Sequence, residues 1–208
     1  ASFVIGSNVY VGTGRDVNYG FTNDWYRYDT GSAIWQQVAS LPADGRQYCT
    51  AFSIDGTGYL FGGSNDYNLY AELWAYDPTN DAWAAKAALP AAGRSSSSSF
   101  VVDGDGYIVL GRYGPDSAIT NVCWRYHPAN DTWEQRASYH GTGRLLANSF
   151  SDGTYAYVVD ANETVRIQAI HVINIQDGIA IVDQGLSAGQ RVVRDGQYKL
   201  KPGLRITE

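Results

Sequence analysis

The sequence is poor in several residues that mark other classes of protein. It has no Met, two Cys and three His in 208 residues. Two Cys cannot build a disulfide scaffold, and three scattered His have no zinc-ligand spacing, so neither a metal nor a cofactor is expected. No run of about 18 apolar residues exists to span a membrane as a helix. The chain opens Ala1-Ser2-Phe3 without a basic stretch, so we expect no signal peptide and interpret the chain as a piece of a longer or processed product.

Basic residues are scarce as well. The formal net charge is −6 and the isoelectric point is near 4.9. Because phosphate binding requires a basic face, nucleic acid is not an expected partner. Glycine and aromatic residues are abundant, with 23 Gly, 16 Tyr and 6 Trp. This composition favours β-sheet and tight turns over helix.

Aromatic residues and arginines recur along the chain at a nearly constant spacing. Trp35, Trp83 and Trp133 are 48 and 50 residues apart. Similar steps relate Trp25, Trp74 and Trp124; Tyr28, Tyr76 and Tyr126; Arg46, Arg94 and Arg144; and Phe3, Phe52, Phe100 and Phe150. Such a period indicates a repeated structural unit. We expect Trp35, Trp83 and Trp133 to occupy equivalent, buried places.

Each repeat predicts four short strands separated by turns. In the middle repeat they are Thr50–Ile54, Tyr59–Phe61, Glu72–Tyr76 and a last strand around Trp83. Strands this short, with turns every 8–12 residues, indicate antiparallel sheets. A four-stranded unit with a period near 50 is typical of a β-propeller blade.

The repeat resembles the kelch repeat over about residues 1–152. The residues that carry the resemblance in the middle copy are Gly62-Gly63, Tyr76 with Trp83 seven residues later, Leu89-Pro90 and Gly93-Arg94. The other copies keep the Tyr-to-Trp spacing but only the second Gly of the pair. The fold prediction is an all-β chain with a partial kelch-type β-propeller of three to three-and-a-half four-stranded antiparallel blades. Three blades leave two open apolar faces, so a second copy, another chain or the tail is expected to cover them.

Residues 153–208 predict a small β tail with a hairpin at Asp177-Gly178. The tail looks like the membrane-proximal segment of periplasmic adaptor subunits of RND-type efflux pumps. The residues that carry this resemblance are Gly153–Val159, Gln184–Val193, Asp195–Gln197 and Leu200–Gly203. The other domains of such adaptors are absent, so we interpret the chain as a fusion near residue 152, either natural or engineered. The tail implies a bacterial chain in a periplasmic or extracellular location.

The candidate ligand-binding residues are Arg46, Arg94 and Arg144, with Ser95 and Ser96. The kelch resemblance places these arginines near the mouth of the central channel, where some family members contact acidic ligands. Guanidinium groups pair bidentately with carboxylates, which suits an anionic ligand. The alternative is that each Arg pairs with a neighbouring carboxylate and that the serines fill crowded space between inner strands.

The sequence therefore predicts a non-catalytic binding or scaffolding module that binds a protein or an acidic small molecule. One alternative is an efflux-adaptor fragment. Another is a sugar-acting kelch enzyme such as a mutarotase, with Asp16, Asp66 or Asp116 as its carboxylate. Cys49 and Cys123 fall on non-equivalent strand positions, so both are expected to be buried free thiols.

Overall fold

The computed structural model describes residues 1–114, 116, 118–151, 156–159, 171–176 and 179–184. The chain divides into two compact units, Ala1–Val158 and Val159–Glu208. The boundary between residues 152 and 153 that the sequence suggested stays a prediction. The described residues form strands and turns without any helix, and so include no helix that could cross a membrane.

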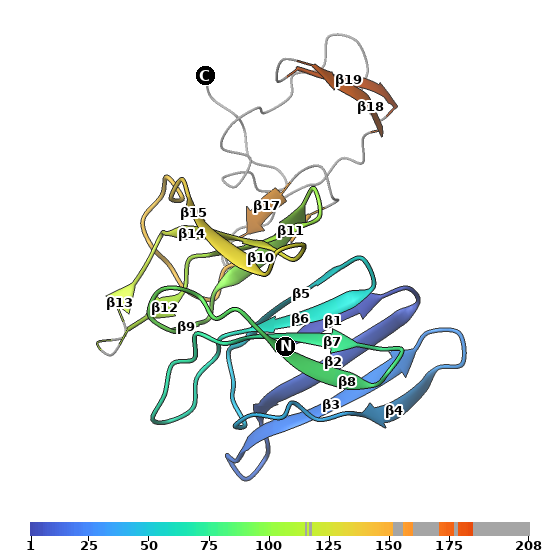
Figure 1. The fold of residues 1–208 in the computed structure, drawn as a ribbon, viewed down its shortest axis with the longest axis vertical. Helices are drawn as coiled ribbons and strands as arrows, with labels where there is room; N and C mark the ends of the chain where they lie inside the picture. Colours follow the sequence, from blue (N-terminus) through green and yellow to red (C-terminus); the bar gives the residue numbers. More distant parts are fainter. Residues whose placement is uncertain (115, 117, 152–155, 160–170, 177–178, 185–208) are drawn as a thin grey trace, which may run out of the picture. The chain divides into compact units, whose positions relative to one another are not determined.

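Three four-stranded antiparallel sheets build the first unit (Figure 1). Blade 1 contains β1 (Ser2–Ile5), β2 (Asn8–Arg15), β3 (Phe21–Asp29) and β4 (Ile34–Val38). Blade 2 contains β5 (Thr50–Ile54), β6 (Thr57–Phe61), β7 (Leu73–Asp77) and β8 (Ala82–Lys86). Blade 3 contains β10 (Ser98–Val102), β11 (Asp105–Val109), β14 (Cys123–His127) and β15 (Thr132–Arg136). Neighbouring strands in each blade follow chain order, as the four-strand repeat predicts.

Shorter strands complete the first unit. β9 (Arg94–Ser95), β12 (Arg112–Tyr113) and β13 (Ala118–Ile119) form a small sheet beside blade 3. β16 (Asn148–Ser151) and β17 (Ala156–Val159) pair as the start of a fourth blade. The innermost strands β1, β5, β10 and β16 contact one another in this order. The predicted all-β, partial propeller is confirmed, and its described sheets do not close into a ring.

The apolar core lies between the blades. Phe3, Tyr10 and Trp25 of blade 1 form one buried cluster with Leu60 and Tyr76 of blade 2. A second cluster joins blades 2 and 3 in the same way. Each blade is therefore stabilised mainly by the apolar surface that its neighbour covers.

The Trp that closes each repeat lies opposite the repeated Tyr in all three blades. The Nε1 of Trp83 donates to the Ala39 carbonyl at 2.8 Å, and that of Trp133 to the Ala87 carbonyl at 2.7 Å. Both indoles thus pack on the preceding blade. Trp35 is 55% exposed. The expectation of equal burial was wrong for Trp35, because no blade covers it among the described residues.

The strand register also shows that Trp25 is not structurally equivalent to Trp74 and Trp124, although the sequence spacing aligned them. Trp25 pairs with Val38, as Leu73 pairs with Lys86 in blade 2. The structural counterpart of Trp74 is therefore Tyr26. A one-residue shift along a strand moves a side chain to the opposite face. This is why Trp25 is fully buried against blade 2, whereas Trp74 packs toward blade 1.

The second unit contains one described hairpin. β18 (His171–Gln176) pairs antiparallel with β19 (Ile179–Gln184). These are the two strands expected around Asp177-Gly178, and the turn itself lies outside the described residues. Most of the residues that carry the efflux-adaptor resemblance also lie outside them.

Cys49 and Cys123 are both free thiols, as expected. Cys123 is buried and Cys49 is partly buried. Burial raises the pKa of Cys49, and raises that of Cys123 to about 11. Because the thiolate is the reactive form, we expect slow labelling of the native chain at pH 8 and rapid labelling of two thiols after denaturation. Titration with a chromogenic disulfide reagent measures both, and fast labelling of the native chain would contradict this prediction.

Candidate ligand-binding site

Arg46 lies in the connection between β4 and β5, and it is 1% exposed. Its Nη1 makes an ion pair with Glu72 Oε2 at 2.8 Å. Its Nε donates to the Asp44 carbonyl at 2.9 Å, and the guanidinium stacks 3.7 Å from the Tyr70 ring centroid. Protein groups thus hold most of this side chain. Of the three guanidinium nitrogens of Arg46, Nη2 is buried without a hydrogen-bond partner.

Arg94 and Arg144 differ from Arg46 in their partners. Arg94 is 4% exposed, and its Nη1 donates to the Val122 carbonyl at 2.9 Å. Burial lowers the pKa of Arg94 to about 10, so the side chain stays protonated at neutral pH. Arg144 is partly buried, with its guanidinium 5.3 Å from the Tyr139 ring centroid.

The three arginines precede the innermost strands and do not lie in them. Arg94 begins β9, and only afterwards does the chain enter β10. Each arginine lies four residues before the first residue of the innermost strand that follows it, β5, β10 or β16. A role for the three arginines in ligand binding stays a prediction. A ligand would have to compete with the protein contacts just described.

The serine run after Arg94 links neighbouring innermost strands. Ser95 is buried, and the Ser96 N–H donates to the Tyr48 carbonyl at 2.8 Å. Three further hydroxyls donate to backbone carbonyls: Ser97 to Leu110, Ser98 to Ala147 and Ser99 to Ala51. The described contacts of this run therefore match the packing alternative, and ligand contacts of Ser95 and Ser96 stay a prediction.

A recess of about 470 Å³ opens beside these connections. Its walls are the loop Ser64–Leu69 of blade 2, the segment Ala92–Gly93, and Arg112 with Gly114 from the blade 3 side. Gly93 allows a close approach of the two walls, because a Cβ atom at this position would lie 2.2 Å from the Leu69 carbonyl oxygen.

The loop that forms one wall of the recess is held by its own hydrogen bonds. Asn65 Oδ1 accepts from the backbone N–H groups of Tyr67 and Asn68 at 3.0 and 2.8 Å. Asn65 Nδ2 donates to the Tyr70 hydroxyl at 2.7 Å. These bonds leave the Tyr67 ring 91% exposed. The loop therefore presents an aromatic ring to solvent on a fixed backbone.

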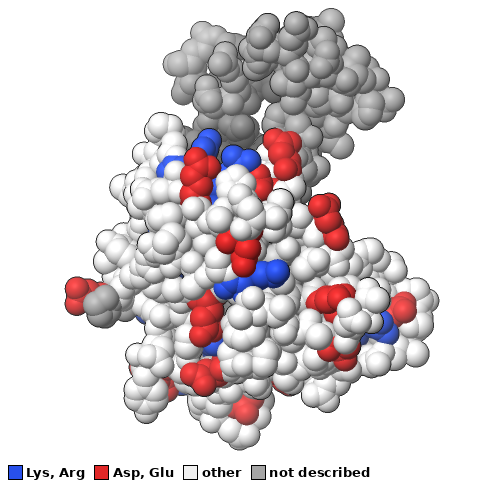
Figure 2. Space-filling model, in the orientation of Figure 1, with Lys and Arg blue, Asp and Glu red and all other residues white. Residues whose placement is uncertain are grey.

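The charged side chains at the recess, Arg15, Asp66 and Arg112, give it a net positive charge. Arg15 Nη2 donates to both carboxylate oxygens of Asp66, at 3.2 and 3.3 Å. Arg112 is exposed, and its side chain makes no ion pair or hydrogen bond with the described residues. Because Arg15 neutralises Asp66, Arg112 remains as a local positive charge on an acidic chain. The face drawn in Figure 2 shows Lys and Arg as sparse groups beside Asp and Glu, without a continuous basic tract.

Sequence reasoning named Asp66 as a loop carboxylate and missed Arg112. The structure brings the two into the same recess. A signal was present in the sequence, since Arg15 and Arg112 both directly follow the repeated second Gly, at Gly14 and Gly111. The described residues contain no group of three or more His, Cys, Asp or Glu that could hold a metal ion.

The family model described as the KLHDC2/KLHL20/DRC7 Kelch-repeats domain matches residues 1–159. The chain belongs to this kelch-repeat family. A solved structure titled "Structure of YjhT" is similar to this kelch chain, with 20% sequence identity and a TM-score of 0.66. The match covers 76% of this chain and 55% of that one, so the chain spans about half the length of that structure. At this identity the likeness shows the fold alone.

No curated protein matches the chain. The family match ends at residue 159, so the efflux-adaptor resemblance of the tail and a fusion near residue 152 stay predictions.

Proposed function

We propose that this kelch chain is a non-catalytic binding module that holds a carboxylate-bearing ligand in the recess beside Arg112. The observation that carries the proposal is the exposed guanidinium of Arg112, which has no partner among the described residues. The carboxylate of the same recess, Asp66, already pairs with Arg15. A guanidinium presents two parallel N–H groups to a carboxylate, so such a ligand is favoured in both charge and geometry.

The size and lining of the recess support the same class of ligand. A volume of about 470 Å³ lies in the range of small-molecule sites and admits one or two side chains of an acidic peptide. The exposed Tyr67 ring offers a flat apolar surface next to the charge. Arg46, Arg94 and Arg144, with Ser95 and Ser96, stay predicted ligand contacts outside the recess. Arg46, Arg94 and Ser95 are buried, so a ligand would reach them only by displacing the protein groups that now cover them.

The alternative of a sugar-acting enzyme finds less support. General acid or base catalysis needs a carboxyl group able to exchange a proton with the substrate. Asp66 lines the recess, but both of its oxygens accept hydrogen bonds from Arg15. The adaptor alternative and the periplasmic or extracellular location rest on the tail resemblance.

Removing the charge of Arg112 is the direct test. We expect Arg112→Ala to weaken binding of a fluorescent oligoglutamate peptide about tenfold, because one charge-assisted pair is lost. Binding should also weaken between 50 and 200 mM salt, because exposed charges are screened. Fluorescence anisotropy gives both dissociation constants.

A matched variant tests whether peptide binding follows the charge of the recess. Asp66→Asn removes the carboxylate that Arg15 neutralises, so the recess becomes more positive and peptide binding should tighten. If the wild-type chain fails to bind the peptide, or if Arg112→Ala and Asp66→Asn bind it as the wild type does, the proposal is wrong.

A further inference from the structure

The exposed ring of Tyr67 is carried by a loop whose backbone is held at its base and at its tip. Ser64 and Leu69 pair as antiparallel neighbours across the base of the loop. At the tip, Arg15 of blade 1 holds the carboxylate of Asp66, directly beside Tyr67. A Tyr ring on a fixed loop offers a large contact area at a low cost in side-chain entropy. Tyr67 is thus a preformed apolar contact at the edge of the recess.

The polar side chains that flank this ring are already used within the protein. Both polar atoms of the Asn65 amide bind inside the loop, and both Asp66 oxygens accept from Arg15. A ligand with many hydroxyl groups needs a hydrogen-bond partner for each one that it buries. An aromatic or aliphatic side chain needs none and gains free energy by covering Tyr67. The loop therefore favours an apolar group beside the carboxylate of the ligand.

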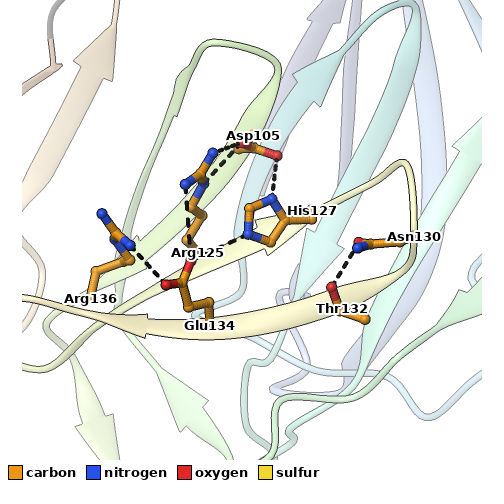
Figure 3. Close-up of polar contacts among 7 residues, drawn as sticks. All are labelled: Asp105, Arg125, His127, Asn130, Thr132, Glu134 and Arg136. Atoms are coloured by element: carbon orange, nitrogen blue, oxygen red, sulfur yellow. Dashed lines mark hydrogen bonds and ion pairs between the residues drawn. The ribbon is translucent and has the colours of Figure 1, made fainter.

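Two other arginines of blade 3 have internal carboxylate partners, which Arg112 lacks among the described residues. Arg125 pairs with Asp105, and Arg136 pairs with Glu134 at 2.8 Å (Figure 3). A carboxylate ligand at either of these arginines would have to replace a partner that the chain already supplies. At Arg112 it would replace none of the described groups. The carboxylate of the ligand is therefore expected at Arg112.

Tyr67 and Arg112 belong to different walls of the recess. Tyr67 lies on the loop of blade 2, whereas Arg112 begins β12 on the blade 3 side. Successive side chains of an extended peptide point to opposite sides of its backbone, and side chains two residues apart point to the same side. An extended peptide between the two walls would therefore reach both of them with adjacent residues.

We propose that the ligand of this recess is an extended peptide segment in which an acidic residue directly neighbours a large apolar residue. The acidic side chain binds Arg112, and the apolar side chain packs on the Tyr67 ring. The peptide assignment rests on the function proposed above and adds the class of partner, because a free small acid has no group to place on Tyr67. A volume of about 470 Å³ admits two such side chains.

Three amidated fluorescent peptides of equal length and charge test the adjacency. They are three repeats of Glu-Phe-Ser-Ser, of Glu-Ser-Phe-Ser and of Glu-Ser-Ser-Ser. The first should bind the wild type about fivefold more tightly than the third, because an aromatic pair forms with Tyr67. The second has the composition of the first but places Glu and Phe two residues apart, so it should bind like the third. Fluorescence anisotropy gives the three dissociation constants.

Two variants assign the effect to the recess. Tyr67→Ser should abolish the difference between the first and third peptides, because the ring that the Phe covers is gone. Arg136→Ala removes an arginine outside the recess that is paired with Glu134, so it should leave all three dissociation constants unchanged. Circular dichroism and thermal unfolding confirm that both variants fold.

The outcomes separate the peptide assignment from the proposed function. If no peptide binds, or if Arg112→Ala binds all three as the wild type does, the proposed function is wrong and the assignment fails with it. If the peptides bind through Arg112 but the first has no advantage, the assignment alone is wrong. The same holds if the second peptide shares that advantage, or if Tyr67→Ser retains it.

Discussion

Replacing Gly58 by Val is expected to lower the free energy of unfolding by about 3 kcal/mol, because it overpacks the contact between blades 1 and 2. A Cβ atom added at Gly58 would lie 2.2 Å from Cε2 and 2.3 Å from Cζ of Phe3. The Phe3 ring cannot swing away freely, since it is buried and stacked on Tyr10 with ring centroids 5.2 Å apart. Urea unfolding followed by Trp fluorescence measures the change.

The reverse substitution, Val to Gly, at the equivalent position of blade 1 is the control. Val9 occupies the equivalent position of blade 1, where no Phe ring of a preceding blade packs among the described residues. Val9→Gly should therefore cost only about 1 kcal/mol through the greater backbone entropy of Gly. Equal effects of Gly58→Val and Val9→Gly would show that the glycine does not serve the inter-blade contact.

The strands of each blade were predictable because their signals are local. Turn residues bracket runs of apolar and aromatic residues, and the expected strand Thr50–Ile54 matches β5 to the residue. The spacing of Tyr76 and Trp83 reflects a real cross-strand pair. Period and turn chemistry therefore carry most of the information about sheet topology.

Burial was harder to predict because it depends on the neighbouring blade. Trp35 matches Trp83 and Trp133 in sequence, yet its exposure depends on whether another blade lies in front of it. The alignment of Trp25 with Trp74 failed for a different reason. Trp25 lies three residues before Tyr28, whereas Trp74 lies two residues before Tyr76, so the step of 49 residues aligned positions on opposite strand faces.

The candidate site was predicted only in part for a physical reason. Recurring arginines drew attention as ligand-binding groups, but Arg46 and Arg94 are buried among protein partners. Arg112 does not belong to the recurring set of arginines, so the repeat pattern did not mark it as a candidate. An unpaired charge is recognised only after every neighbour has been placed in three dimensions, which a one-dimensional pattern cannot do.

The inter-blade role of Asp131 predicts the other large loss of stability. Its Oδ1 accepts from the Ala87 N–H at 2.9 Å and from the Tyr126 hydroxyl at 2.7 Å. Asp131→Ala removes both bonds and leaves the two donors between blades without an acceptor. Because hydrogen bonds to charged groups contribute about 1.5–3 kcal/mol each, we expect a loss of about 3 kcal/mol. Ala33→Asp supplies the control, since the new carboxylate has no blade to bind and should change stability by less than about 0.5 kcal/mol.

The contribution of Asp131 should also depend on pH. Burial opposes ionisation of this carboxyl group, but the hydrogen bonds from Ala87 and Tyr126 outweigh it and lower the pKa of Asp131 below its ordinary value. A lowered pKa in the folded state stabilises the fold fully above the unfolded pKa of about 4, and this stabilisation disappears as the pH falls through the folded value. The stability difference between the wild type and Asp131→Asn should therefore be constant from pH 7 to 5 and shrink below pH 4. Parallel unfolding curves at pH 7, 5 and 3 measure it, and a difference that persists unchanged at pH 3 would show that ionised Asp131 does not hold the two blades together.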